Sequence, residues 1–342
     1  MKQLMGLMAA GMSAFLFFSA GVAISSLAAA DAAAQKGDGW VKYAGNPVLG
    51  DPVKLGTCFD VNVVKGRSAK FDMYFSWRPK KSVAVCSSDD GIHWTAPEIV
   101  LRPDSACGWE QIINRASIVH KDGKWHMWYT GQVLGGKGRK GTSKIGYAVS
   151  DDGRTFRKVQ KDPVMVAEAK FEQDNVMCPH VLWDERRGAW RMWYSAGEQY
   201  EPNVNCYAES KDGIKWEKSP LNPVLGKGTR EWEQNRVGGC EVHPLPDGTF
   251  VMFYIGYKDI NTASIGAAVS KDGISGWRRL KANPLVAPTP DTFDASACYK
   301  PSVFRDEKND CWMLWYNGRN RDKGEYIGLV LKAGLDLGGL EP

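Results

Sequence analysis

The sequence predicts an all-β fold made of repeated sheets, because three kinds of segment recur along it. A turn phrase of the form Ser-x-Asp-Gly occurs four times, roughly 60 residues apart, with its glycines at Gly91, Gly153, Gly213 and Gly273. A strand-like segment of methionine followed by aromatic residues occurs at 73–75, 127–129, 192–194, 252–254 and 313–316. A segment containing Asn-Pro occurs at 40–49, 216–225 and 277–286. One supersecondary unit repeated at a fixed period is typical of propellers and other repeat proteins. We therefore predict a five-bladed β-propeller with four-stranded antiparallel blades.

The turn phrase predicts one hairpin in each blade. Aspartate and glycine both tolerate the positive φ of a tight turn, so Asp-Gly between two strand-like runs is a strong hairpin signal. A second hairpin precedes each phrase; in residues 117–129 the chain turns at Asp122 and Gly123. Two consecutive hairpins supply the four strands of one blade.

The N-terminal segment is predicted to complete the last blade. The methionine-aromatic segment occurs five times but the turn phrase only four, so the C-terminal blade lacks its outermost strand. Residues 40–49 match the segments 216–225 and 277–286, which follow the turn phrase in other blades. We expect the N-terminal strand to close the ring and so to protect the sheet edges.

The first 34 residues have the pattern of a secretory signal peptide. Lys2 is followed by a long apolar stretch and then by alanine-rich sequence. We expect residues 1–34 to be removed and residues 35–342 to form a single domain, in a secreted or periplasmic protein without a membrane span. The alternative is an uncleaved anchor, for which the apolar stretch is long enough. The formal net charge is only +5 and the basic residues are dispersed, so no nucleic acid partner is expected.

Four of the eight cysteines precede the predicted innermost strands at nearly equivalent positions: Cys58, Cys178, Cys240 and Cys298. Two interpretations remain open. The thiols of neighbouring blades form disulfides, Cys58 with Cys298 and Cys178 with Cys240, or all four are small buried apolar groups.

Candidate functional residues lie where the innermost strands begin, because these strands line the central channel of a propeller and crowd around one mouth. Two carboxylates stand out there, Asp60 in the first blade and Glu241 in the fourth. We expect them to face each other across the channel. Asp174, shortly before the third innermost strand, is a third acidic candidate that would orient or tune the pair.

Glycoside hydrolysis requires at least two carboxyl groups that face one pocket. In this interpretation Asp60 is the base or nucleophile, and Glu241 is the acid, whose pKa burial or a nearby negative charge raises. The alternative is structural: Asp60 and Glu241 form ion pairs with Arg115 and Lys300 that brace the channel.

Other polar and aromatic residues near the mouth are candidates for binding substrate. They lie at the strand entrances or on loops after second strands, and they are Arg115, His180, His243, Lys300, Asn62, Trp77 and Arg319. The sequence contains no zinc motif, phosphate loop or nucleophile elbow. No metal or other cofactor is therefore expected, with a structural cation in the channel as the alternative.

The repeats together with Asp60 and Glu241 resemble the superfamily of five-bladed propeller glycoside hydrolases. This superfamily includes the arabinanase and β-xylosidase group (family 43), the invertase group, the mannoside phosphorylases and the anhydrogalactosidases. The resemblance covers residues 35–342 and implies that Asp60, as the first-blade aspartate, is the base or nucleophile. Family 43 itself has an aspartate on the second blade and a glutamate on the third, where this sequence has Arg115 and His180. The chain is thus similar to a diverged branch of the superfamily.

The sequence therefore predicts an exported glycoside hydrolase that acts on an oligosaccharide or polysaccharide. One alternative is a glycoside phosphorylase in which Arg115, Lys300 and His243 hold phosphate. A second alternative is a propeller that binds sugar without catalysis. The oligomeric state is not predicted.

Overall fold

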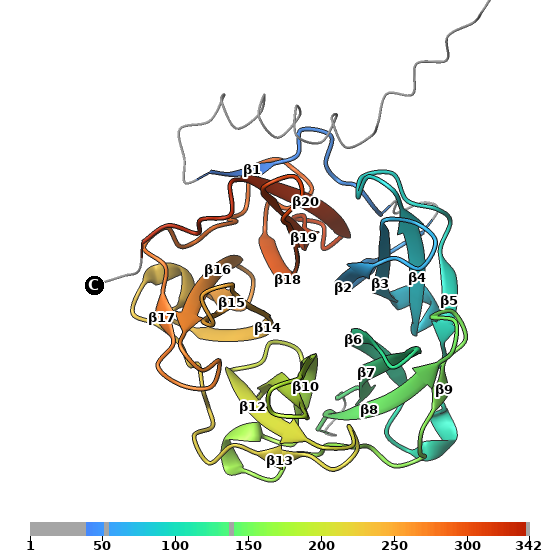
Figure 1. The fold of residues 1–342 in the computed structure, drawn as a ribbon. Helices are drawn as coiled ribbons and strands as arrows, with labels where there is room; N and C mark the ends of the chain where they lie inside the picture. The colour runs from blue at the N-terminus through green and yellow to red at the C-terminus, as the bar shows by residue number, and fades with distance from the viewer. Residues whose placement is uncertain (1–38, 51–54, 137–139, 340–342) are drawn as a thin grey trace, which may run out of the picture.

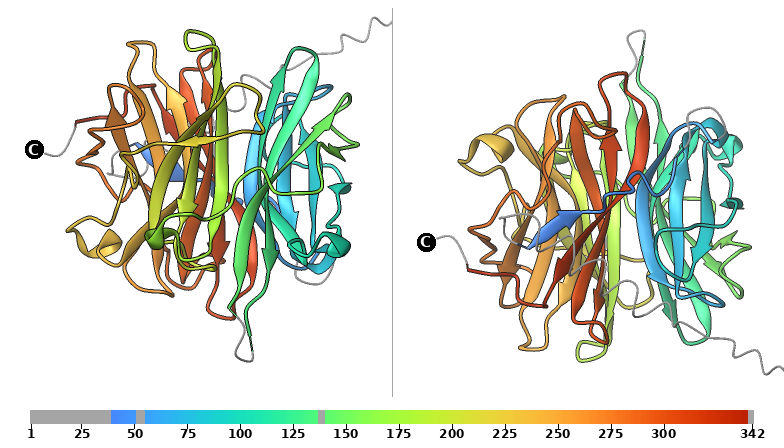
Figure 2. Two further views of the ribbon diagram at one scale, coloured as in Figure 1. Left: turned by 90° about the horizontal axis from the view of Figure 1, so that it is seen from below. Right: turned by 90° about the horizontal axis from the view of Figure 1, so that it is seen from above.

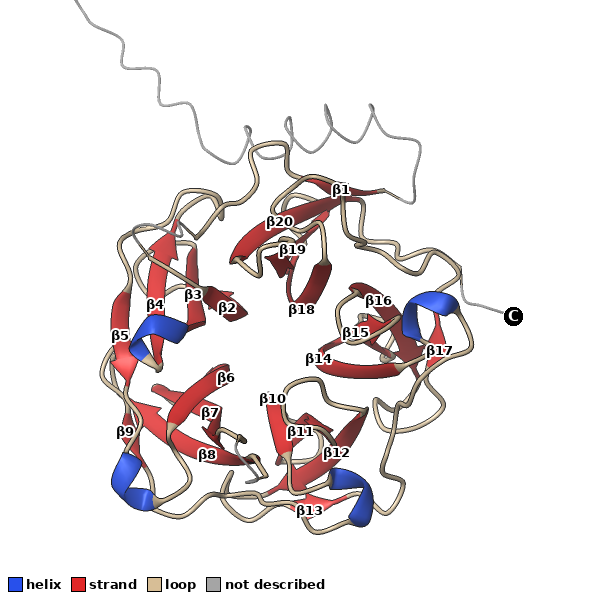
Figure 3. Cartoon of the chain, turned by 180° about the vertical axis from the view of Figure 1, so that it is seen from behind, coloured by secondary structure: helices blue, strands red, loops and turns tan. Residues whose placement is uncertain are grey.

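The computed structural model describes residues 39–50, 55–136 and 140–339. These residues form strands and only four one-turn 3₁₀-helices: η1 (Arg78–Lys80), η2 (Ser105–Cys107), η3 (Lys170–Glu172) and η4 (Glu231–Glu233). Figure 3 shows the helices away from the centre of the molecule. The all-β prediction is confirmed. The predicted signal peptide, residues 1–34, lies outside the described residues, and no helix within the described ranges is long and apolar enough to cross a membrane.

Three separate four-stranded antiparallel sheets account for residues 58–218. The first contains β2 (Cys58–Lys65), β3 (Phe71–Trp77), β4 (Ser82–Ser88) and β5 (Glu98–Leu101). The second contains β6 (Ile112–Lys121), β7 (Lys124–Val133), β8 (Thr142–Ser150) and β9 (Arg157–Lys158). The third contains β10 (Val176–Asp184), β11 (Ala189–Ala196), β12 (Val204–Ser210) and β13 (Glu217–Lys218).

The remaining strands form one eight-stranded sheet instead of two separate sheets. One antiparallel group contains β14 (Arg236–Pro244), β15 (Phe250–Tyr257), β16 (Ala263–Ser270) and β17 (Arg278–Arg279). The other contains β18 (Ala297–Asp306), β19 (Cys311–Arg319), β20 (Glu325–Ala333) and the N-terminal β1 (Trp40–Lys42). A single parallel residue pair, Ala263 with Ala297, joins the two groups. The sheet is therefore mixed, and the number of separate sheets is smaller than predicted.

The sheets are arranged around a central axis, with β2, β6, β10, β14 and β18 nearest the centre (Figure 1). Seen edge-on, the strands run between two opposite faces where the connecting loops gather (Figure 2). β1 pairs antiparallel with β20, so the described N-terminal segment forms the outer strand beside the C-terminal hairpin.

Each innermost strand contains a β-bulge at an equivalent position. The pairing register with the second strand shifts there, and the residue at the start of each shift has a positive φ: Asp60, Arg115, Cys178, Gly239 and Lys300. An extra residue in one strand bends the strand and redirects its side chains. The five bulge residues therefore lie around the axis at one end of the channel.

The bulges correct one alignment made from the sequence. When the blades are aligned by their turn phrases in the sequence, Glu241 takes the position equivalent to Asp60. The structure instead places Gly239 at that position. Glu241 lies two residues further along, where the other innermost strands carry Asn62, Ser117, His180 and Ser302. The alignment was wrong because the spacing to the following turn differs between blades: Gly91 comes 31 positions after Asp60, but Gly273 comes 34 positions after Gly239.

The two main sequence repeats meet between neighbouring sheets. The indole N–H of Trp315 on β19 donates to the carbonyl of Gly91 at 2.9 Å. Trp128 and Trp193 bond in the same way to the turn glycines of the next sheets, and the Tyr74 hydroxyl does so to Gly153. Core side chains surround each contact; Phe71, for example, packs edge-on against Trp315 with ring centroids 5.3 Å apart. The methionine-aromatic strand of one sheet therefore holds the turn of the next.

All eight cysteines are free thiols in the structure. Seven are buried and Cys107 is half-buried. The structure thus agrees with the interpretation of the four innermost cysteines as buried apolar groups.

Candidate active site

The bulged ends of the innermost strands surround a cavity of about 210 Å³, here called the axial cavity. Three carboxylates line it: Asp60, Glu201 and Glu325. Four cationic side chains line it as well: Arg78, Arg115, Lys300 and Arg319. Cys178 and the phenols of Tyr257 and Tyr299 complete much of its polar wall.

Asp60 lines this cavity and is held by contacts of its backbone and its side chain. Its backbone N–H donates to Asn317 Oδ1 at 2.7 Å, and its side chain is buried. Asp60 Oδ2 accepts a hydrogen bond from Ser76 Oγ at 3.4 Å and lies 3.6 Å from Arg115 Nε. Burial raises the pKa of Asp60, while the positive charges of Arg115 and Lys300 oppose this rise. The pKa of Asp60 is raised overall, because burial outweighs the effect of these cations.

Glu325, the first residue of β20, lies in the same cavity. The Tyr299 hydroxyl donates to its Oε1, and Arg78 Nη2 lies 3.6 Å from its Oε2. Within the described residues Oε2 is buried and accepts no hydrogen bond. Burial raises the pKa of Glu325, the charge of Asp60 raises it further, and Arg78 and Tyr299 lower it. Burial outweighs the other influences, so the pKa of Glu325, like that of Asp60, is raised above its ordinary value.

Glu201 lies between β11 and β12 and has a more cationic environment. Its Oε1 is 4.0 Å from Arg319 Nη1. Burial raises its pKa, whereas a hydrogen bond from Tyr257 and the charges of Arg115 and Arg319 lower it. The pKa of Glu201 is raised overall, because burial outweighs these groups.

Sequence reasoning missed both Glu201 and Glu325. Neither belongs to an innermost strand, and neither falls within a repeated segment, so aligning the repeats could not find them. The available signal was their position after a second strand, where substrate contacts occur in many β proteins. That signal did identify Arg319, which lines the axial cavity.

The structure places Glu241 in a different cavity, of about 850 Å³, at the other end of the innermost strands. Asn62, His180 and His243 line this second channel cavity together with Glu241. Glu241 Oε1 lies 3.9 Å from His180 Nδ1 and 3.7 Å from His243 Nε2. Burial raises the pKa of Glu241 to about 8 and lowers that of His243 to about 4. The expected arrangement of Asp60 and Glu241 around one mouth is therefore wrong.

Glu241 belongs to a set of side chains that link neighbouring innermost strands. Its Oε2 accepts a hydrogen bond from Val303 N–H at 2.7 Å. Three equivalent side chains accept from the next strand in the same way, Asn62 from Ile118, Ser117 from Val181 and Ser302 from Val63. His180 Nε2 bonds instead to the carbonyl of Val242 at 2.9 Å. These contacts run from strand to strand around the axis and return to β2.

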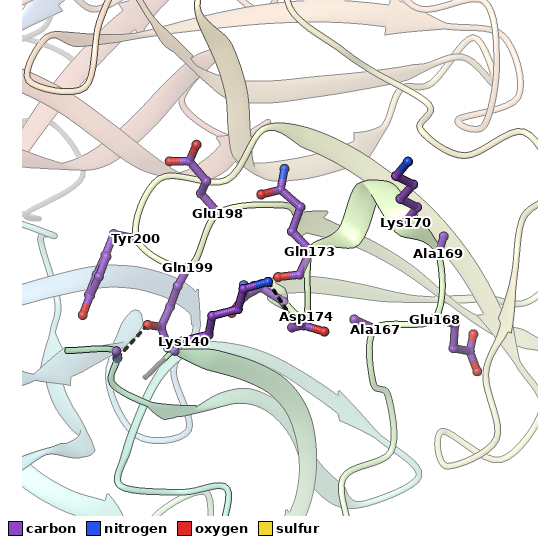
Figure 4. Close-up of a pocket in the computed structure, with 13 residues that line it drawn as sticks. Lys140, Ala167, Glu168, Ala169, Lys170, Gln173, Asp174, Glu198, Gln199 and Tyr200 are labelled. Carbon is purple, nitrogen blue, oxygen red and sulfur yellow. Dashed lines mark hydrogen bonds and ion pairs between the residues drawn. The ribbon is translucent and has the colours of Figure 1, made fainter. Parts of the chain in front are cut away.

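The remaining sequence candidates lie apart from Asp60. Asp174 is exposed in a pocket outside the channel, 3.9 Å from Lys140 Nζ (Figure 4). Trp77 donates its indole N–H to the Leu55 carbonyl at 2.8 Å and does not line the axial cavity. Of the predicted site residues, the structure thus brings together Asp60, Arg115, Lys300 and Arg319. Among the described residues, no three His, Cys, Asp or Glu side chains converge as metal ligands would.

Comparison with known families identifies the chain. The profile of the glycosyl hydrolases family 32 N-terminal domain matches residues 59–237, more than half of the sequence. The chain belongs to this family. The predicted membership of the propeller glycoside hydrolase superfamily is confirmed, and the family-32 match includes Asp60, Arg115 and Glu201.

The relatives of this family-32 domain include both phosphorylases and hydrolases. A 1,2-beta-oligomannan phosphorylase of Thermoanaerobacter sp. (strain X514) is 28% identical over 246 residues, covering 70% of this chain and 74% of that protein. A thermostable family-43 glycoside hydrolase superposes with a TM-score of 0.65 at 17% identity, covering 84% of this chain and 95% of the other. An exo-1,5-alpha-L-arabinanase from a bovine ruminal metagenomic library gives a TM-score of 0.60 at 16% identity, covering 88% of this chain and 100% of the other. The structural neighbours show a glycoside hydrolase-like propeller fold.

Proposed function

We propose that this protein is an exported glycoside hydrolase whose active site is the axial cavity. The observation that carries this proposal is that Asp60 and Glu325 line one cavity, in which Arg115 lies 3.6 Å from Asp60 and the Tyr299 hydroxyl donates to Glu325. The charge of Asp60 contributes to the raised pKa of Glu325, so the two carboxyl groups are suited to divide the base and acid roles between them. The family membership supports a reaction at a glycosidic bond.

In this proposal Glu325 donates its proton to the leaving oxygen as the bond from that oxygen to the anomeric carbon breaks. In one route Asp60 removes a proton from the water that attacks the anomeric carbon; Asp60 later releases this proton to solvent, and Glu325 takes up a proton from solvent. In the other route Asp60 attacks the anomeric carbon and forms an ester; a water molecule then attacks that carbon, gives its proton to Glu325, and breaks the bond to Asp60. The Oε2 atom of Glu325, which accepts no hydrogen bond within the described residues, is the oxygen that we propose carries the proton of the acid.

The cations of the cavity have a separate role. Arg115, which lies near both Asp60 and Glu201, opposes the rise in the pKa of Asp60 that burial causes and links Asp60 to the loop that carries Glu201. Glu201 and Arg319 are proposed to hold sugar hydroxyl groups. Because Glu241 lies in the second channel cavity, we assign it no role in the reaction.

We further propose that the fold is a closed propeller of five blades. The eight-stranded sheet is then two blades, β14–β17 and β18–β20 with β1, since only the pair Ala263 and Ala297 joins them. The pairing of β1 with β20 and the hydrogen bonds that return from Ser302 to Val63 support closure. Residues 35–342 would form this single domain. Export with removal of residues 1–34 is tested by measuring the intact mass of the mature protein.

A glycoside phosphorylase is the second candidate, favoured by the excess of cations in the axial cavity. Four cationic groups face three carboxylates there, and one relative is a phosphorylase by name. The phosphate would lie near Arg115 and Lys300. His243, expected from the sequence to join them, lies in the second channel cavity and is left out of this proposal.

The test is a screen of purified protein against aryl glycosides and oligosaccharides, including β-1,2-linked manno-oligosaccharides, with and without inorganic phosphate. Turnover without phosphate that disappears in Asp60→Asn supports the hydrolase. Turnover only with phosphate supports the phosphorylase. Binding of sugar without any product would contradict both and indicate a non-catalytic carbohydrate-binding propeller.

A further inference from the structure

A pocket of about 590 Å³ lies directly beside the axial cavity, on the outer side of the loop between β11 and β12. This loop is the wall between the two spaces. Glu198 and Gln199 line the outer pocket, here called the loop pocket, while Glu201 lines the axial cavity. Tyr200 lines both. Figure 4 shows Tyr200 at one end of the loop pocket, with Glu168 and Ala169 at the other.

We propose that the loop pocket binds further sugar units of an oligosaccharide whose reacting end occupies the axial cavity. This inference rests on the proposed function and specifies its substrate as a chain of several sugar units. Three features of the pocket support this inference: an exposed aromatic ring, a wall held in place by hydrogen bonds, and a buried oxygen that accepts no hydrogen bond.

The aromatic ring is that of Tyr200, which is 56% exposed and is the only exposed phenylalanine, tyrosine or tryptophan side chain of the described residues. An aromatic face kept in water at the edge of two cavities is suited to pack against the apolar face of a sugar ring. The Tyr200 carbonyl accepts a hydrogen bond from Arg115 Nη2 at 3.3 Å. The backbone that carries this ring is therefore tied to a residue that contacts Asp60.

The wall is held in place from both sides. Gln199 Nε2 donates to the carbonyls of Val133 at 2.7 Å and Thr142 at 3.0 Å, which belong to β7 and β8. Arg236 Nη1 bonds to Glu198 Oε2 at 2.8 Å and to the Glu201 carbonyl at 2.9 Å. A binding surface that is fixed before the ligand arrives loses less conformational entropy on binding.

The unused acceptor belongs to Asn175, which lines the loop pocket and is only 4% exposed. Its amide N–H groups donate to the carbonyls of Gln173 at 2.8 Å and Gly197 at 3.0 Å. Its Oδ1 accepts no hydrogen bond within the described residues. A buried acceptor without a donor costs free energy, which a sugar hydroxyl group would recover by donating to it.

The charges of the pocket favour an uncharged sugar. Two lysines and three carboxylates line it: Lys140, Lys170, Glu168, Asp174 and Glu198. Asp174 lies near Lys140, and Glu198 is paired with Arg236. Among the described lining residues, no cationic excess remains for an anionic ligand, in contrast to the axial cavity.

The experiment measures kcat/KM for β-1,2-linked manno-oligosaccharides of two to six units, and for arabino-oligosaccharides of the same lengths. We expect kcat/KM of the wild-type protein to rise about tenfold from the shortest to the longest substrate of the series that it turns over. Tyr200→Ala should reduce this gain to less than about twofold, and Tyr200→Phe should retain it. Leu221→Ala is the matched control, because Leu221 is equally exposed and lines neither cavity.

An equal length-dependent gain in Tyr200→Ala and wild type would overturn the inference while leaving the proposed function intact. Absence of turnover with every substrate would instead contradict the function. In that case calorimetric titration measures the affinity for the same oligosaccharides. Affinity that rises with substrate length, and that falls in Tyr200→Ala but not in Leu221→Ala, supports the loop pocket. A wild-type protein that neither turns over nor binds any of them overturns both.

Discussion

Arg115 Nε lies 3.6 Å from Asp60 Oδ2, and the two residues occupy equivalent left-handed bulge positions on neighbouring innermost strands. Both side chains are nearly inaccessible, so each charge compensates the burial of the other. Removing one member of a buried ion pair leaves the other unpaired at a considerable cost in stability. The bulges therefore position Asp60, and the charge of Arg115 opposes the rise in the pKa of Asp60 that burial causes.

Replacing Asp60 with asparagine should strongly reduce turnover. The amide neither accepts a proton from water nor attacks the anomeric carbon, so we expect kcat/KM to fall by a factor of about 10² to 10⁴. Because Arg115 loses its partner, the unfolding temperature should fall as well. Rates are therefore measured well below the unfolding transition, with circular dichroism as the check on folding. A folded Asp60→Asn protein with wild-type kcat/KM would remove Asp60 from the mechanism.

Replacing Glu325 with glutamine should produce a defect that depends on the leaving group. The amide cannot protonate the glycosidic oxygen, so kcat/KM for an oligosaccharide should fall by about 10² to 10⁴. A dinitrophenyl glycoside departs without protonation, and with this substrate the loss should be less than about tenfold. Asp60→Asn should show no such rescue. If Glu325→Gln reduces kcat/KM equally for both substrates, Glu325 has a structural role.

The pH dependence of the reaction tests the same assignment. The pKa of Glu325 is raised by burial and by Asp60, so the acid should stay protonated above the usual range of a glutamate. Activity on oligosaccharides should then decline as the pH rises through that raised pKa. The pH profile of Glu325→Gln with the dinitrophenyl glycoside should lack this decline; a decline at the same pH in the variant would indicate another titrating group.

The fold was more predictable from the sequence than the site. The turn glycines and methionine-aromatic strands recur because they contact each other between sheets, as Trp315 and Gly91 do, so the repeats report a physical contact. The β-bulges leave no recurring sequence pattern. Alignment of the sequence repeats therefore matched Glu241 with Asp60, although the residue equivalent to Asp60 is Gly239, two residues earlier. Glu201 and Glu325 belong to single connections that are not repeated, and their proximity to Asp60 depends on the assembled structure.

Glu241 should make stability decrease with rising pH. Its pKa is about 8 in the folded protein and near the ordinary value of 4.5 when unfolded, so the folded state binds more protons between these values. The stabilisation is complete below the unfolded pKa and is lost as the pH rises through about 8. His180 and His243, whose pKa values are lowered, are neutral in both states above about pH 7, which leaves Glu241 as the changing member of this cluster.

The comparison is between wild type and Glu241→Gln, whose amide oxygen can still accept from Val303 N–H. From pH 7 to 8 the unfolding free energy of the wild type should fall by about 1 kcal/mol relative to that of the variant. Urea unfolding at several pH values measures the difference. Parallel curves for the two proteins would show that Glu241 has the same pKa in both states. Unchanged turnover in Glu241→Gln is also expected, because the second channel cavity lies apart from Asp60.

Replacing Gly91 with alanine should destabilise the contact between the first and last sheets. Gly91 has a φ of +80°, and a Cβ atom there would lie 2.7 Å from Trp315 and 2.9 Å from Met313, both of them buried. Gly123 is a matched control, because its φ of +73° is also left-handed while nothing lies within 4 Å of an added Cβ. Both variants incur the strain of a left-handed alanine, about 1 kcal/mol, and only Gly91→Ala also overpacks the core, by about 1–3 kcal/mol. Urea unfolding should therefore rank the proteins as wild type, Gly123→Ala and Gly91→Ala in decreasing stability. Equal losses in the two variants would mean that the indole of Trp315 moves aside without cost, and that the turn and the aromatic strand recur for separate reasons.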